Sequence, residues 1–100
     1  MQATADNSST HHTVLELTVH NHAGVMSHVC SLFSRRAYNL DGILCMPLDS
    51  GEQSRMWLRV HEEDRLAQVI KQLEKLEDVL EVNRHGADHG VFTGLQEFFK

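Results

Sequence analysis

The stretch Val14-Leu15-Glu16-Leu17-Thr18-Val19-His20 runs directly into Asn21-His22-Ala23-Gly24-Val25-Met26, and this junction decides the fold. In residues 14–20 apolar and polar side chains alternate, which is the period-two pattern of a strand with one buried face. From Val25 to about Arg36 the apolar residues recur at helical spacing. We therefore predict a strand, a short loop that contains glycine, and a helix that packs on the apolar face of the strand.

The loop at residues 21–26 has the chemistry of a small anion site. The first N–H groups of a helix have no partner within the helix, and the positive end of the helix dipole favours a carboxylate. Gly24 has no side chain, so a ligand can approach these groups closely. The same sequence is also ordinary connection chemistry, and Asn21 is a favoured helix cap. The loop alone leaves a structural role and a binding role open.

The remaining sequence repeats this order of elements. Residues 40–48 are largely apolar, and Pro47 near their end predicts an edge strand or the end of the strand. Residues 55–61 alternate again. A second helix is expected from about Glu63, followed by a last short strand at residues 79–83. The apolar positions of the second helix are Leu66, Val69, Ile70, Leu73 and Leu76.

Strand, helix, strand, strand, helix, strand is the order of the ferredoxin-like βαββαβ fold, an α+β class. Right-handed crossovers place both helices on one face of a four-stranded antiparallel sheet. We predict one such domain at residues 13–86. It follows a disordered tail at residues 1–12 and precedes a C-terminal tail at residues 87–100, in which we expect at most a short helix and an apolar patch. The patch residues are Phe92, Leu95, Phe98 and Phe99.

Composition argues against several classes of partner. The chain has 100 residues, with 9 basic against 14 acidic side chains and a net charge of -5, whereas nucleic-acid binding depends on clustered Lys and Arg. No apolar stretch reaches the length of a membrane span, and no signal peptide is evident. Cys30 and Cys45 show neither CxxC spacing nor a disulfide framework. We expect a cytoplasmic protein with reduced thiols, without a nucleic-acid or membrane partner.

Other activities of the ferredoxin-like fold need residues that the chain lacks. Metal-transfer domains carry CxxC in the first loop, RNA-binding sheets carry several aromatics on the third strand, and small phosphatases carry an arginine in a phosphate loop. Here the first loop is NHAGVM and the third strand is RMWLRV. No paired nucleophile and base stand out either, so we expect no catalysis by this chain alone.

Eight histidines raise the alternative of a metal site, above all His20, His22 and His28, which can converge near the first loop. His11-His12 falls in the expected tail, and no paired Cys/His or HExxH spacing is present. We therefore expect no metal site.

Three runs resemble the ACT domain of the small regulatory subunits of acetolactate (acetohydroxyacid) synthase, most of all the short isozyme I type. They are LELTVHNHAGVMSHVCSLFSRRAYNLDGILC (15–45), SRMWLRV (54–60) and LEKLEDVLEV (73–82). The pairing of NHxGVMxHVCxLFxRRAxN with DGILC is the specific feature. The chain departs from the family at Ala23, where proline is usual, so the loop loses a fixed φ angle and binding weakens at most.

The resemblance implies a non-catalytic subunit that activates a large catalytic subunit and binds L-valine for feedback inhibition. Thiamine diphosphate, magnesium and FAD would belong to the large subunit, so we expect no cofactor in this chain. Family members dimerise through their ACT domains and hold the amino acid between them. The positions that match the ligand contacts are Asn21, Ala23, Gly24, Val25 and Met26 in the loop, and Asn39, Asp41, Gly42 and Ile43 on the neighbouring strand.

Chemistry suggests the role of each group around such a ligand. The N–H groups of Gly24 to Met26 would take the carboxylate, and oxygens of Asn21 and Asp41 would accept from the ammonium. Val25 and Ile43 would cover the isopropyl group. Valine would be preferred over leucine or isoleucine only modestly, because one methylene is worth ~1 to 3 kcal/mol. Without the resemblance, Asn39 would be an ordinary turn residue.

Trp57, with Arg55 and Arg59 beside it, faces outward in the predicted third strand. Aromatic and arginine side chains often anchor interfaces, so these residues are candidates for docking on the catalytic subunit. The alternative is that the C-terminal tail buries Trp57. A different ACT-type amino-acid sensor, alone or attached to another enzyme, is the alternative function.

Overall fold

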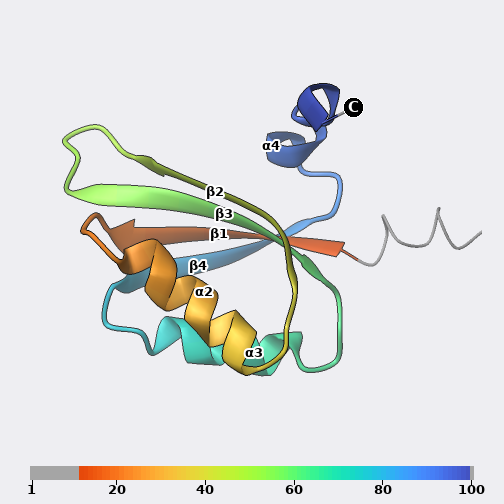
Figure 1. Ribbon diagram of the computed structural model, residues 1–100, viewed down its shortest axis with the longest axis horizontal. Helices are drawn as coiled ribbons and strands as arrows, with labels where there is room; N and C mark the ends of the chain where they lie inside the picture. Colours follow the sequence, from red (N-terminus) through yellow and green to blue (C-terminus); the bar gives the residue numbers. More distant parts are fainter. Residues whose placement is uncertain (1–11, 100) are drawn as a thin grey trace, which may run out of the picture.

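The computed structural model describes residues 12–99, and its elements follow the predicted βαββαβ order (Figure 1). The predicted disordered tail, apart from His12, lies outside the described residues. None of the helices in the described part is long and apolar enough to cross a membrane. The elements are β1 (His12–His20), α2 (Val25–Arg35), β2 (Leu40–Pro47), β3 (Gln53–His61), α3 (Leu66–Glu74), β4 (Val79–Gly86), α4 (Gly90–Thr93) and the 3-10 helix η1 (Gln96–Phe99).

The four strands form one antiparallel sheet in the order β2-β3-β1-β4. β1 lies between β3 and β4. β2 is an edge strand, as the sequence predicted, and it ends at Pro47, one residue before the predicted end at residue 48. Both α2 and α3 cover the same face of the sheet, while the C-terminal α4 lies on the other side (Figure 1). The predicted ferredoxin-like fold is confirmed.

The core lies between the sheet and the two long helices. Leu15 pairs with Leu58, which pairs in turn with Ile43, so these side chains form a row toward the helices. Each fully buried aliphatic side chain stabilises the fold by roughly 1.5 to 3 kcal/mol. Of the stripe predicted for the second helix, Ile70 and Leu76 are only partly buried. The most deeply buried residues include Leu15, Leu17, Val19, Val29, Leu32, Phe33, Met56, Leu58, Val60, Leu66 and Leu73.

The second helix begins at Leu66, three residues later than predicted from Glu63. Arg65 stands at the N-cap position of this helix, and its guanidinium contacts the segment that follows the first helix. It donates to the backbone oxygens of Arg36 at 2.6 Å and Ala37 at 3.0 Å. Arg65 thus satisfies carbonyl groups that follow α2, where no helical partner remains.

His12 is an ordered strand residue, which corrects its assignment to the disordered tail. It begins β1 and pairs with His61, the last residue of β3. β1 is one of the two central strands, so its N-terminal end gains partners from both neighbours. Thr13 pairs with Val60 on one side and with Gly86 on the other. β4 accordingly extends to Gly86, beyond the predicted end at residue 83.

The C-terminal segment covers part of the sheet face that the two long helices leave open. The ring of Phe92 lies against Gly42, where an added Cβ would come within 2.8 Å of Phe92 Cε1. The ring of His89 lies 4.7 Å from that of Trp57. Phe98 and Phe99, in contrast, are 81% and 82% exposed. The predicted apolar patch is therefore divided between the sheet and solvent.

Candidate functional site

The first loop ends at Gly24, which precedes α2 with a φ of 91°. This left-handed conformation favours glycine and confirms the predicted helix start. Asn21 does not cap the helix. Its Nδ2 donates to the backbone oxygen of Gly51 at 2.7 Å, and its backbone N–H donates to Glu52 at 3.0 Å. The capping alternative is therefore wrong, and Asn21 fastens the loop to the β2–β3 hairpin.

The first turn of α2 offers backbone donors to solvent. The N–H of Val25 donates to the backbone oxygen of His22 at 3.3 Å. Within the described part of the chain, the N–H groups of Gly24 and Met26 have no hydrogen-bond acceptor, and both residues are exposed. Two of the three predicted carboxylate donors are thus open. The side chain of Val25 is only 5% exposed and belongs to the core, so it offers a ligand little apolar surface.

A histidine and an aspartate hold the same loop from the other side. His22 Nε2 lies 2.7 Å from Asp78 Oδ2, and His22 Nδ1 lies 2.6 Å from the oxygen of Ala23. With an acceptor at each nitrogen, the imidazole favours the doubly protonated form. The hydrogen bond to Asp78, followed by that to Ala23, raises the pKa of His22, and the hydrogen bond from His22 lowers the pKa of Asp78. The contact with the backbone oxygen of Ala23 restrains the loop at that position.

The second group of predicted ligand contacts lies at the start of β2. Asn39 Nδ2 donates to Asp41 Oδ1 at 2.6 Å. Asp41 Oδ2 also lies 3.0 Å from His12 Nε2 and 2.9 Å from His61 Nε2. Gly42 faces Phe92, and Ile43 packs against the core. The Asp41 carboxylate thus has several partners within the chain.

A single chain does not bring the two groups together. Asn21 follows His20, which pairs with Gln53 at one end of β3, whereas Leu40 pairs with Val60 near the other end. The seven residue steps from Gln53 to Val60 span roughly 23 Å, at about 3.3 Å per residue. Figure 1 shows the loop before α2 and the connection into β2 at opposite ends of the sheet.

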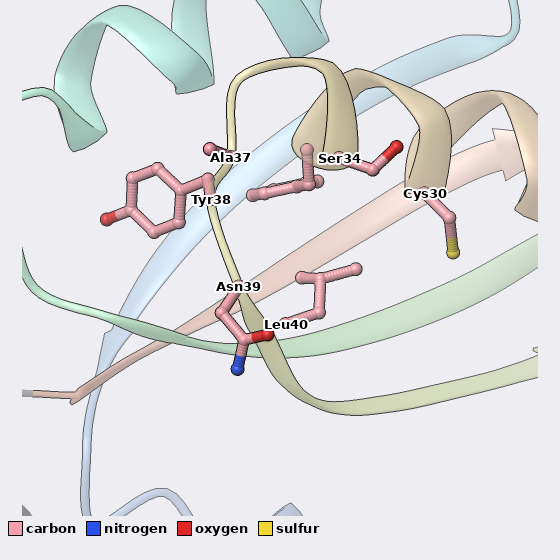
Figure 2. Close-up of a pocket in the computed structure, with 7 residues that line it drawn as sticks. Cys30, Ser34, Ala37, Tyr38, Asn39 and Leu40 are labelled. Atoms are coloured by element: carbon pink, nitrogen blue, oxygen red, sulfur yellow. The ribbon is translucent and has the colours of Figure 1, made fainter.

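A pocket that the sequence analysis missed lies between the end of α2 and the start of β2 (Figure 2). Asn39 lies at this pocket, and Cys30, Phe33 and Leu40 supply most of its apolar lining. The helical spacing placed Cys30 and Phe33 on the inner face of α2. It gave no indication that part of this surface stays accessible beside an edge strand. The lining residues are Cys30, Phe33, Ser34, Ala37, Tyr38, Asn39 and Leu40.

Trp57 is only half-buried on the open face of the sheet, where it contacts the rings of His85 and His89 at centroid distances of 5.6 Å and 4.7 Å. The C-terminal segment therefore covers part of Trp57, as the alternative anticipated.

The two arginines that flank Trp57 differ in their contacts. Arg55 Nη1 pairs with Glu16 Oε2 at 2.6 Å, and Arg55 Nη2 donates to Thr18 Oγ1 at 3.2 Å. Arg59 makes only a long contact, with Nη2 3.5 Å from His12 Nδ1. Of the two arginines, Arg59 therefore has the weaker described hydrogen bonding.

Four of the described histidines form two pairs, each around a single carboxylate. His22 and His28 converge on Asp78, with His28 Nδ1 3.7 Å from its Oδ2. His12 and His61 converge on Asp41. One of the two grounds for expecting no metal site, the placement of His12 in a disordered tail, is wrong, because His12 begins β1. Sequence spacing carries no signal for this second group because three different strands supply it.

Comparisons with known proteins agree on one protein family. The model of the AHAS small subunit-like ACT domain matches residues 15–81. The chain is 48% identical over 94 residues to the acetolactate synthase isozyme 1 small subunit of Escherichia coli K12, covering 94% of this chain and 98% of that one. It is 40% identical over 74 residues to the isozyme 3 small subunit of the same strain, covering 73% and 45%.

Solved structures show the same likeness. The crystal structure of the acetolactate synthase small subunit from Thermotoga maritima superposes with a TM-score of 0.66 at 26% identity, covering 88% of this chain and 67% of that one. The ACT domain of the GTP pyrophosphokinase of Chlorobium tepidum superposes with a TM-score of 0.59 at 16% identity, covering 74% and 96%. The second likeness shows a shared fold alone.

The His22–Asp78 pair predicts a pH dependence of loop order. Because the pKa of His22 is raised above 6.5, the stability that protonated His22 adds to the loop is complete below pH 6.5. It is lost as the pH rises through the raised pKa. The pKa of Asp78 lies below 3.8, so the stability that its carboxylate adds to the loop is lost only as the pH falls through that lowered pKa.

Asp78→Asn should bring the pKa of His22 back toward 6.5 in an NMR titration of the imidazole. Glu77→Gln removes the same charge one residue away and should leave the His22 pKa raised; an unchanged His22 pKa in Asp78→Asn would contradict the assignment.

Proposed function

Because the chain belongs to the family of acetolactate synthase small subunits with an ACT domain, we propose that it is the regulatory subunit of an acetolactate synthase in branched-chain amino acid biosynthesis. The identity of 48% over nearly the whole isozyme 1 small subunit supports this assignment. The reaction, with thiamine diphosphate, magnesium and FAD, then takes place in a separate large subunit, which this chain activates. An unrelated ACT-type sensor is less well supported, because neighbours of that kind share the fold alone.

We propose further that two copies pair through the exposed edge of β2. An edge strand presents unpaired backbone groups, and antiparallel pairing with a second copy would satisfy them. Two-fold pairing sets the start of one β2 beside the end of the other. The end of β2 leads into the hairpin at residues 48–52, to which Asn21 is bonded. Asn39 to Ile43 of one copy would thus come near the first loop of the other.

The proposed ligand is L-valine, held between these two groups of residues. The open N–H groups of Gly24 and Met26, at the positive end of α2, would bind its carboxylate. Nδ2 of Asn21 already donates to Gly51, which leaves its Oδ1 to accept from the ammonium. These open donors beside the hairpin are the observation that carries the proposal.

The second copy would supply the remaining contacts. A carboxylate has about four lone-pair positions, and the Asp41 carboxylate has three partners in Asn39, His12 and His61, so one position is left for the ammonium. Leu40 and the apolar part of the pocket at Asn39 would cover the isopropyl group, and Ile43 follows on the same strand. Apolar cover of this kind discriminates between valine, leucine and isoleucine only weakly.

Regulation follows if valine binds one arrangement of the dimer better than another. The ligand contacts two copies at once, so its affinity depends on their relative position. A coupling free energy of ~1 to 3 kcal/mol, or about 5- to 150-fold in affinity, is sufficient for feedback inhibition. The dimer without valine would hold the catalytic subunit in its active arrangement, and valine would favour the other one.

Gly24→Asp tests the carboxylate site. It puts a negative side chain beside the proposed ligand carboxylate, and the repulsion should weaken L-valine binding by about tenfold or more. At a φ of 91° any side chain adds backbone strain, so Gly24→Asn is the matched control with the same shape and no charge. Binding is measured from backbone amide NMR shifts of the purified chain, with D-valine as a negative control.

Each result of this titration has a definite reading. Saturable, stereospecific shifts at residues 21–26 and 39–43, weakened much more by Asp than by Asn, are expected. Equal valine affinity in the Asp and Asn variants would remove the first loop from the carboxylate site.

The open sheet face around Trp57, Arg55 and Arg59 is our proposed docking surface for the catalytic subunit. Aromatic and arginine side chains are frequent anchors of protein interfaces. The exposed Phe98 and Phe99 lie in the C-terminal segment that covers the same face. Of the two arginines, Arg59 is the more available to a partner, because its described contact is longer than those of Arg55.

Trp57→Ala tests this surface in an activation assay with the large subunit. Loss of a central interface residue should weaken activation by about tenfold or more and leave L-valine binding within about twofold of the parent. Leu80→Ala, an exposed residue of β4 that is 45% accessible, serves as the control and should activate normally. Normal activation by Trp57→Ala would show that the docking surface lies elsewhere.

A further inference from the structure

Two imidazoles and a carboxylate meet at one end of the sheet. His12 is the first residue of β1, His61 the last of β3, and Asp41 the second of β2. One ligand atom from each lies within 4.8 Å of the other two. The Nε2 atoms of His12 and His61 lie 3.0 Å and 2.9 Å from Asp41 Oδ2.

The fold positions these groups without long connections. His12 and His61 are direct cross-strand partners, and their ring centroids are 4.7 Å apart. The β2–β3 register shifts between Leu40 and Gly42, so Asp41 sits at an irregularity of the edge strand. Irregularities of this type redirect a side chain from the regular alternation of a strand. The arrangement therefore follows from pairing of the strands.

A further contact orients the carboxylate. Asn39 Nδ2 donates to Asp41 Oδ1 at 2.6 Å, which leaves Oδ2 toward the two imidazoles. Partners behind a ligand group fix its direction and are a regular part of metal sites. The side chain of His12 is only 8% exposed, whereas those of Asp41 and His61 are 22% and 47% exposed. The cluster is held by the sheet on one side and open to solvent on the other.

We propose that His12, Asp41 and His61 bind a divalent transition-metal ion of the Zn²⁺ class. Imidazole nitrogen with one carboxylate suits zinc, iron, cobalt or nickel, whereas magnesium and calcium prefer oxygen ligands alone. Metal–ligand bonds of about 2.0 to 2.2 Å separate neighbouring ligand atoms by roughly 3 to 3.5 Å. The two nitrogen-to-oxygen distances are already close to that range. Three protein ligands leave at least one position for water or another ligand.

Arg59 is the group that opposes the metal. Its Nη2 lies 3.5 Å from His12 Nδ1, and for Nδ1 to accept from this guanidinium, Nε2 must carry the ring proton that faces Asp41. Metal binding at Nε2 requires the proton at Nδ1, where it would face the guanidinium. Arg59 must therefore turn away when the ion binds, and its positive charge weakens binding until it does. Removal of this charge should tighten the site.

The proposal does not rest on the amino-acid site, although Asp41 takes part in both. The experiment therefore uses the full chain and the metal alone. Zn²⁺ is titrated calorimetrically into the parent chain and into His12→Gln and His61→Gln at neutral pH. Each of these variants should weaken Zn²⁺ binding by about tenfold or more, and Arg59→Gln should bind at least as tightly as the parent.

Histidine controls separate a built site from scattered surface ligands. His85→Gln removes a histidine on the same sheet face that pairs with Glu16 instead of Asp41, and His22→Gln removes one from the Asp78 group. Both should bind Zn²⁺ within about twofold of the parent. Amide NMR spectra show whether each variant is folded. Co²⁺ adds a second measurement, because its pseudocontact shifts should centre on residues 12, 41 and 61.

Three results would overturn the proposal. One is the absence of Zn²⁺ binding by the folded parent chain. Another is undiminished binding by folded His12→Gln and His61→Gln. The third is a loss in His85→Gln or His22→Gln as large as that in the two ligand variants, which would assign the ion to adventitious surface histidines.

Discussion

Pairing of β1 with strands on both sides is the constraint on which the rest of the structure depends. β1 pairs with β3 over its whole length and with β4 over most of it, so both of its ends are fixed. At one end His20 is held against Gln53 and Asp78, and the first loop follows at once. At the other end His12 is held opposite His61 and reaches Asp41. β1 thus sets the positions of two separate polar clusters, and each cluster surrounds a single carboxylate.

Patterns within single elements were predictable from the sequence. Alternation over residues 14–20 identified the central strand, and the apolar stripe from Val25 identified the first helix. Pro47 correctly indicated an edge strand because it cannot donate a ladder hydrogen bond. The family resemblance rested on the same stretches and agrees with the comparisons.

Partners from different elements were not predictable. Asn21 followed the statistics of helix caps, yet the hairpin 30 residues later supplies its acceptor. His12 seemed to belong to a polar tail, because a strand end is fixed by the neighbouring strands and leaves little trace in its own sequence. Arg65, which lies just before α3, similarly donates to backbone oxygens at the end of α2. Such contacts depend on register, which a pattern along one element does not contain.

Because the two groups of ligand contacts lie far apart in one chain, the proposed ligand site is complete only in a dimer. The first loop and the start of β2 lie at opposite ends of the sheet within one chain, and two-fold pairing of β2 edges would bring them together between chains. The affinity of a ligand held between two chains depends on how the two copies are arranged. A site within one chain would have no such dependence.

The most direct test of this shared site mixes two defective chains. A Gly24→Asp chain has an altered loop, and an Asn39→Ala chain has an altered strand, so neither should bind L-valine well alone. After unfolding and refolding together, mixed dimers would combine the intact loop of one chain with the intact strand of the other. Our account predicts recovery of about one quarter of the normal valine sites at parental affinity. No recovery in a mixture shown by mass spectrometry to contain mixed dimers would contradict a site shared between two copies.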